Sequence, residues 1–237
     1  MLTGPFAHCG IRWGLTGTVP KADYEFMGIK CSIGEVVNKI AAKTLQDKGV
    51  LANCNVNIIQ TIETKMFSNY QEELKWLTTD DRRMSFLAQT IKSISSSGNT
   101  LILVDRISAG QTLNKKLPGS VFISGSTKNP DRKEQYDEVS TATNKIIIAT
   151  YGVASVGINI PRIFNLVLIE PGKSFVRVIQ SIGRGIRKAQ DKDHVEIWDI
   201  TSSCKFAKRH LTQRKKFYKE ANYPYNIEKI NYENSYT

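Results

Sequence analysis

Short apolar runs alternate with longer segments of helical periodicity along most of this chain. Three of the runs are continuous: Thr100–Val104 (TLILV), Lys145–Ala149 (KIIIA) and Phe164–Ile169 (FNLVLI). An apolar run of this length, without alternation, is typical of a strand whose two faces are both buried. The pattern therefore predicts a sheet covered on both sides.

The remaining segments complete an α/β order. Alternation or β-branched residues predict further strands at Asn55–Ile62, Ser120–Ile123 and Val195–Ile200. Helical spacing predicts helices at Ile33–Asp47, Tyr70–Ser95 (in two pieces), Ala109–Lys116, Asp131–Thr141, Ser174–Arg187 and Ser203–Ala221. Residues 1–22 are expected to form a strand end and loop, and the last 16 or so a packed or frayed tail.

Strands that alternate with helices predict an α/β fold, a parallel sheet with helices on both faces. In such sheets ligands bind at the carboxyl ends of the strands. The chemistry of this chain is therefore expected directly after Val104, Ile123, Ala149 and Ile169.

The charge of the chain points to a polyanion. The formal net charge is +11 over 237 residues, and from Lys173 onward there are 14 Lys and Arg against 7 Asp and Glu. Such a surplus favours binding to phosphates. By itself it is equally consistent with an ordinary solvated basic surface.

Several function classes are disfavoured by what the sequence lacks. The four cysteines and three histidines share no zinc-ligand spacing, so no metal site is predicted, and reduced thiols indicate the cytoplasm. No apolar run reaches membrane-spanning length, so a membrane partner is not expected. No G-x-S-x-G elbow or paired carboxylate follows a strand, which disfavours a stand-alone hydrolase or nuclease.

The sharpest local pattern is Q-x-x-G-R-x-x-R within the helix predicted at Ser174–Arg187. On a helix, Gln180, Gly183, Arg184 and Arg187 share one face. Two guanidinium groups one turn apart repel each other unless an anion lies between them or they face different partners, and they match phosphate geometrically. A triphosphate is the ligand this face favours; the alternative is an ordinary basic helix.

This pattern resembles motif VI of the superfamily 2 helicases, and the rest of the chain falls into register with that family. Residues 149–161 (ATYGVASVGINIP) resemble motif V, 102–106 (ILVDR) motif IV, 123–125 (ISG) the strand-then-glycine element that follows it, and 14–20 (GLTGTVP) motif III. Within the family, the likeness is greatest to the UvsW-type helicases of tailed phages, which are DNA branch-migration and repair motors.

The resemblance implies a second, RecA-like motor domain and assigns roles to its residues. Arg187 and Arg184 would be arginine fingers that stabilise charge at the γ-phosphate. Roles in nucleotide binding and coupling would fall to Gln180, Gly183, Gly157, Asn159, Thr16 and Thr18. Contacts with the nucleic-acid backbone would fall to Thr150, Tyr151, the Gly152–Gly157 loop, Asp105, Arg106 and Gly125.

One position departs from the family. Residue 159 is Asn where many relatives have Asp, and an amide can still hydrogen-bond a ribose hydroxyl but carries no charge.

Most of the first motor domain is not recognisable in these residues. A phosphate-cradling G-x-x-x-x-G-K-[ST] loop is absent, because residues 125–128 (GSTK) have the right residue types in the wrong order. Residues 137–140 (DEVS) imitate an acidic box but belong to a solvated helix. ATP with Mg²⁺ is therefore expected to be held mainly by a first domain supplied in cis or in trans. The chain could be a fragment, a split gene product or a free-standing domain.

The expected organisation has four parts: a first-domain remnant at 1–22, a linker with a connecting helix at 23–54, the second RecA-like domain at 55–202 and a basic helix with a tail at 203–237. Two functions remain open. The chain is either half of an ATP-dependent DNA helicase acting on branched or single-stranded DNA, or a module that binds or anneals DNA without catalysis.

Overall fold

The structure is a computed structural model, and it describes residues 8–16, 23–40, 42–48, 53–125, 142–157, 162–172 and 194–232. The chain divides into a small unit, Met1–Ala41, and a large unit, Ala42–Thr237. None of the helices in the described ranges is both long and apolar enough to cross a membrane.

In the small unit, the helix lies earlier than the sequence pattern predicts. Helix α1 spans Asp23–Ile33 and ends at Gly34, whose φ of +113° lies in the left-handed region that favours glycine. The Gly34 N–H donates to the Lys30 carbonyl and closes the last turn. The predicted helix Ile33–Asp47 is therefore wrong in its first half; its second half contains helix α2, Ala42–Asp47, which belongs to the large unit.

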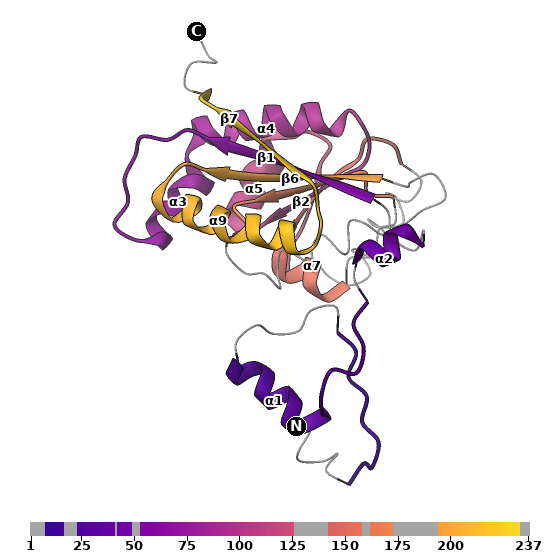
Figure 1. Ribbon diagram of the computed structural model, residues 1–237. Coiled ribbons are helices and arrows are strands. Elements are labelled where there is room, and N and C mark those ends of the chain that lie inside the picture. The colour runs from indigo at the N-terminus through magenta and orange to yellow at the C-terminus, as the bar shows by residue number, and fades with distance from the viewer. Residues whose placement is uncertain are drawn as a thin grey trace. The chain divides into compact units, whose positions relative to one another are not determined.

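The large unit is built on one seven-stranded sheet with the order β3-β4-β2-β5-β6-β1-β7, in which every pairing is parallel (Figure 1). The strands are β1 Asn53–Thr61, β2 Thr100–Val104, β3 Val121–Ile123, β4 Ile146–Thr150, β5 Asn165–Ile169, β6 His194–Ser202 and β7 Tyr225–Ile230. All carboxyl ends therefore point to the same edge of the sheet, which we call the carboxyl edge.

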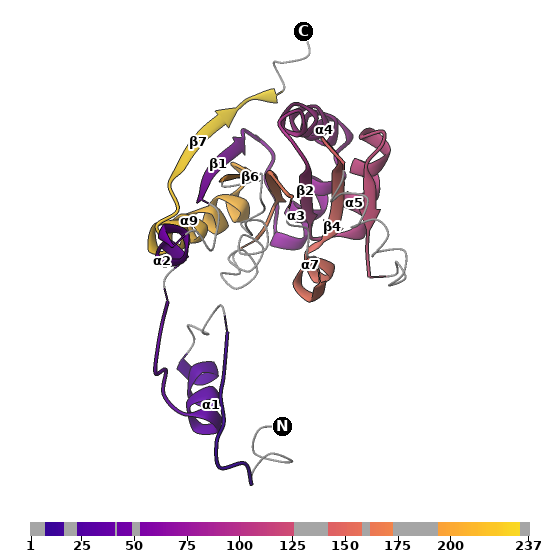
Figure 2. The ribbon, with the colours of Figure 1, turned by 90° about the vertical axis from the view of Figure 1, so that its right-hand side faces the viewer.

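Helices cover both faces of this sheet, as the continuous apolar runs predict. Within β2, Leu101 and Leu103 face one core, while Ile102 and Val104 face the other. The first core is shared with α7 (Tyr151–Gly157) and α9 (Lys205–Glu220), and the second with α4 (Asp81–Ser95) and α5 (Ile107–Lys116). Figure 2 shows α9 on one side of the sheet and α4 and α5 on the other.

The predicted break in the Tyr70–Ser95 helix is confirmed, and Asp80 causes it. Helix α3 spans Tyr70–Thr79, and α4 begins at Asp81. The Asp80 N–H donates to the Trp76 carbonyl at the end of α3, and its carboxylate accepts the Arg83 N–H at the start of α4, at 2.9 Å. Asp80 is thus the C-cap of α3 through its backbone and the N-cap of α4 through its side chain.

Two predictions need correction. The Gly152–Gly157 segment is not a loop: it belongs to α7, because Val153 and Ala154 bury their side chains in the core. Of the two alternatives for the C-terminal tail, its described part is packed and not frayed, and it contains a strand that was not predicted: β7, an edge strand beside β1. The helices predicted at Asp131–Thr141 and Ser174–Arg187 lie outside the described residues.

Candidate nucleic-acid interface

The motif segments meet at the carboxyl ends of three neighbouring strands. The strand pairings align Val104 of β2 with Thr150 of β4, and Ile123 of β3 with Ala149. The residues that follow, Asp105-Arg106, Ser124-Gly125 and Tyr151-Gly152, leave the sheet at nearly the same level. Because adjacent strands lie about 4.8 Å apart, the three segments share a strip of the carboxyl edge about 10 Å wide.

Arg106 is held in place at this edge by its neighbours. Its guanidinium Nη2 donates to Oε1 of Gln71, on α3, at 2.7 Å. Its backbone forms the N-cap of α5, and that helix packs closely on β3: a Cβ built on Gly110 would lie 2.2 Å from the Phe122 ring. Gly110 therefore sets the position of α5, and through it that of Arg106. Nothing in the sequence pattern pointed to Gln71.

Two glycines at the edge have no packing reason to be glycine. Gly125 and Gly152 are exposed, and a Cβ at either position would meet no side chain or sequence-distant backbone atom of the described residues within 4 Å. Neither has the positive φ that would demand glycine. Between them lies Thr150, which is half-buried, whereas the side chain of Tyr151 is 5% exposed and packs in the sheet core. The edge thus carries two exposed glycines near the Thr150 hydroxyl and the Arg106 guanidinium.

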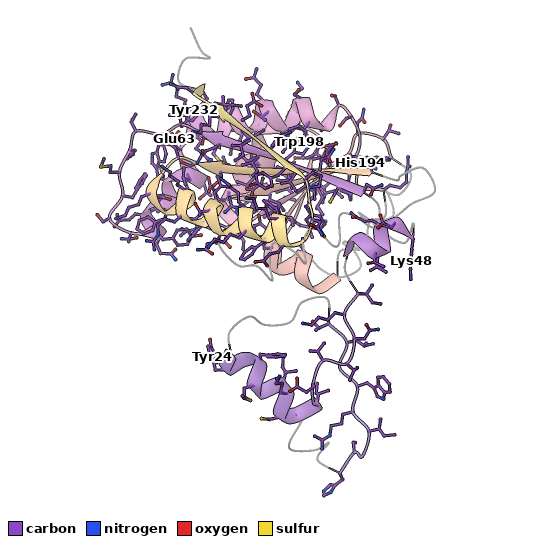
Figure 3. The ribbon with its side chains drawn as sticks, viewed as in Figure 1. Tyr24, Lys48, Glu63, His194, Trp198 and Tyr232 are labelled. Carbon is purple, nitrogen blue, oxygen red and sulfur yellow. The ribbon has the colours of Figure 1, made fainter. Side chains whose placement is uncertain are left out.

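A buried charge network lies farther along the same edge, at the ends of β1 and β5. Arg83 is fully buried; its Nη2 donates to Glu170 Oε1 at 2.8 Å, and its Nε forms an ion pair with Glu63 Oε1 at 3.3 Å. Glu63 also accepts the Tyr232 hydroxyl at 2.8 Å (Figure 3). Figure 3 shows that pair at one end of the sheet and His194, the first residue of β6, at the other.

Glu170 has both a strained backbone conformation and a raised side-chain pKa. Its φ is +42°, a left-handed value that costs a non-glycine residue of the order of 1 kcal/mol or more. Burial raises the pKa of Glu170 to about 7, although the charges of Arg83 and Arg214 and a hydrogen bond from Thr201 lower it. Sequence reasoning missed this residue because no motif of the family includes it.

A second buried network holds α9 against the sheet. Arg214 of α9 is 1% exposed and binds Asp199 of β6 with two nitrogens, at 2.8 and 2.9 Å. The Tyr218 hydroxyl donates to the same carboxylate at 2.7 Å. Burial and the neighbouring Asp199 both raise the pKa of Tyr218. Arg214 therefore does not belong to the basic surface in which its sequence position placed it.

The two networks anchor the turn that follows β5. Arg83 holds Glu170 at its start, and Arg214 Nη1 donates to the Gly172 carbonyl at its end, at 2.8 Å. This turn leads directly into the segment that carries Q-x-x-G-R-x-x-R. Sequence reasoning had no signal for either anchor, since the contacts join residues far apart in the chain.

The other predicted residues are distributed as follows. Thr16 is exposed in the small unit, and the backbone of Gly157 ends α7. Gln180, Gly183, Arg184, Arg187, Asn159 and Thr18 lie outside the described residues. Within the described ranges, His, Cys, Asp and Glu nowhere form a group of three that could hold a metal ion.

Comparison with known proteins finds helicases that are similar to this chain. Residues 82–189 match the model of the helicase conserved C-terminal domain. The ATP-dependent DNA helicase uvsW of Enterobacteria phage T4 is 26% identical over 221 residues, which are 89% of this chain but 44% of that protein. The chain therefore spans less than half the length of this relative.

Solved structures show the same fold. The crystal structure of T4 UvsW superposes with a TM-score of 0.65 over 77% of this chain and 42% of that one, at 21% identity. A fragment of a putative HsdR subunit of a type I restriction enzyme from Vibrio vulnificus YJ016 superposes with a TM-score of 0.69 over 90% of this chain and 43% of that one, at 16% identity. Residues 82–189 therefore resemble the helicase conserved C-terminal domain, and the fold of the large unit is that of the matched part of T4 UvsW.

Proposed function

We propose that this chain is the second motor domain of an ATP-dependent DNA helicase and that its carboxyl edge binds the DNA backbone. In this proposal Arg106, Thr150 and the backbone at Gly125 and Gly152 contact phosphates, with Asp105 beside them. The proposed partner is branched or single-stranded DNA, as the resemblance implies. Hydroxyl, guanidinium and backbone N–H groups bind phosphate without reading base sequence, as a translocating motor requires.

The observation that supports this proposal is the pair of exposed glycines at the edge. A Cβ at Gly110 would meet the Phe122 ring, whereas among the described residues a Cβ at Gly125 or Gly152 would meet no side chain within 4 Å. Absence of a side chain at two neighbouring strand ends lets a ligand approach the backbone closely. Both positions lie in segments that resemble the nucleic-acid motifs of the family.

The proposed catalytic part concerns the nucleotide. Arg184 and Arg187 would act as arginine fingers, with Gln180 and Gly183 on the same helical face, toward a triphosphate bound with Mg²⁺ by the first motor domain. Bound Mg²⁺ would neutralise charge on the phosphates, and the two guanidinium groups would stabilise the charge that develops during transfer. The anchored turn at Glu170–Gly172 supports this role, because it fixes the start of the segment that presents them.

The test combines this chain with a separately produced first motor domain that carries a phosphate-binding loop, for instance the N-terminal half of the T4 relative. The mixture is expected to hydrolyse ATP in a DNA-dependent manner. Arg187→Ala is expected to reduce the rate by about 10³-fold or more. Lys92→Ala, an exposed lysine of α4, serves as the control and is expected to leave the rate unchanged. Hydrolysis that survives Arg187→Ala would refute the finger assignment.

A non-catalytic DNA-binding or annealing module is the second candidate, favoured by the positive net charge of +11. The test described above distinguishes the two candidates. A non-catalytic module would bind DNA in a salt-sensitive manner, but its mixture with a first motor domain would not hydrolyse ATP.

A further inference from the structure

Helix α9 presents a row of positive side chains to solvent. Lys205, Lys208, Arg209, Lys216 and Lys219 are all exposed. Their spacing places them along one side of the helix. The one exposed carboxylate on the helix is Glu220, in its last position. Among the described residues, no carboxylate forms an ion pair with Lys208, Arg209, Lys216 or Lys219. We call this row the α9 stripe.

The side of α9 opposite the stripe is fixed to the sheet by buried contacts. The pair Arg214–Asp199 and the Tyr218 hydroxyl hold its second half. Glu73 of α3 holds its beginning: this carboxylate, 1% exposed, accepts the N–H groups of Phe206 at 3.0 Å and Ala207 at 2.6 Å. The stripe is therefore carried on a helix that cannot rotate or slide without breaking buried charged contacts.

The stripe begins near the proposed interface and leads away from it. Helix α9 follows β6, which lies two strands from β2 in the sheet, so it starts about 10 Å from the end of β2 along the carboxyl edge. From there it crosses one face of the sheet toward the start of β7 (Figures 1 and 2). From Lys205 to Lys219 the helix rises about 21 Å.

We propose that the α9 stripe binds the phosphate backbone of double-stranded DNA, beside the strand that the carboxyl edge tracks. A row of about 21 Å matches about six base pairs of one strand of a straight duplex. Sites for unpaired strands add exposed aromatic rings on which bases stack. The α9 rings do not meet this need, because Phe206, His210 and Phe217 are half-buried and Tyr218 is buried. The proposal rests on the proposed function, since it assigns the duplex arm of the same DNA substrate.

The experiment measures binding of the whole chain to a blunt DNA duplex and to a single strand of equal length by fluorescence anisotropy, over a range of salt concentrations. The test variant removes three charges from the stripe: Lys208→Gln, Arg209→Gln and Lys216→Gln. The control variant removes the same residue types from α4 and α5, on the opposite face: Arg82→Gln, Lys92→Gln and Lys115→Gln. A third variant, Arg106→Gln, tests the carboxyl edge separately. Circular dichroism confirms that each variant is folded.

For duplex DNA, each lost phosphate contact lowers the slope of log K against log salt by about 0.9, so the stripe variant is expected to lose about 2.7 from this slope. The control variant, with the same net charge, is expected to lose less than about 1. Single-strand binding is expected to stay near wild type for the stripe variant and to fall for Arg106→Gln.

Three results would overturn the inference: equal losses in the stripe and control variants, no loss in either, or equal losses for duplex and single strand in the stripe variant. The first two leave the proposed function intact if Arg106→Gln still weakens single-strand binding. If Arg106→Gln leaves single-strand binding unchanged, the proposed interface at the carboxyl edge is contradicted instead. The comparison of the stripe variant with the control variant on duplex DNA is not affected by that result.

Discussion

The buried pair Arg214–Asp199 allows a quantitative test of what holds α9 in place. Both side chains are at most 1% exposed, and Asp199 receives hydrogen bonds from two Arg214 nitrogens and the Tyr218 hydroxyl. Asp199→Asn keeps the size of the side chain but removes its charge. The guanidinium is then left buried, with the Gly172 carbonyl as its other strong acceptor.

Removing one partner of a buried ion pair costs about 3 to 5 kcal/mol, because the other charge stays desolvated. Asp199→Asn is therefore expected to lower the free energy of unfolding by that amount, a large part of the 5 to 15 kcal/mol typical of a domain. Arg214→Met leaves the carboxylate with Tyr218 as its donor and is expected to cost a similar amount. The double variant leaves no unpaired charge, so its cost is expected to fall about 2 kcal/mol or more below the sum of the two.

Urea unfolding followed by far-UV circular dichroism measures these values, with the m-value as a check that the same surface is exposed on unfolding. The matched control is Lys215→Met, the half-exposed neighbour of Arg214 on α9, for which a change within about 0.5 kcal/mol is expected. If the two single variants add to the double within about 0.5 kcal/mol, the reasoning is refuted, because the two charges would then not stabilise each other.

Two further predictions concern the turn and the edge. The pKa of Glu170 is raised to about 7 in the folded protein, above its unfolded value near 4.5. The stability that the protonated Glu170 side chain contributes to the fold is therefore fully present below pH 4.5 and is lost as the pH rises to 7. Over this pH range, the free energy of unfolding of the wild type, measured with urea, is expected to fall by about 3 kcal/mol relative to that of Glu170→Gln. Free energies of unfolding that change in parallel with pH in the two proteins would contradict this. Gly110→Ala is expected to cost about 1 to 3 kcal/mol through the Phe122 contact, whereas Gly152→Ala is expected to leave the free energy of unfolding unchanged or slightly higher and to weaken DNA binding. Equal stability losses in both glycine variants would contradict the distinction.

Much of the fold could be predicted from local sequence alone. The strand Thr100–Val104 is found with the predicted ends, because a strand buried on both faces must be apolar at every position. The edge residues Asp105, Arg106, Gly125 and Thr150 could be placed because parallel strands bring their carboxyl ends to one side. These predictions depend only on the chemistry of each residue and of its neighbours in the chain.

Strand β7 shows what local sequence could not determine. Four of its six residues are exposed. Because an edge strand with so little cover needs few apolar residues, its sequence shows no apolar period that would predict a strand. Its place in the sheet comes from pairing with β1, more than 150 residues earlier in the chain.

The buried charges make the same point more strongly. Arg83, Glu73 and Arg214 are charged residues in polar helices, and sequence alone assigns such residues to the surface. The tertiary structure buries them because each meets a partner that chain position does not reveal: Glu170, the start of α9 and Asp199. The sequence by itself determined the first six strands, the helices α3, α4, α5 and α9, and the edge that carries the motifs. Only the tertiary structure decided which charges hold the turn and α9 in place and which lie exposed on the surface, because burial of a charge depends on a partner brought near by folding.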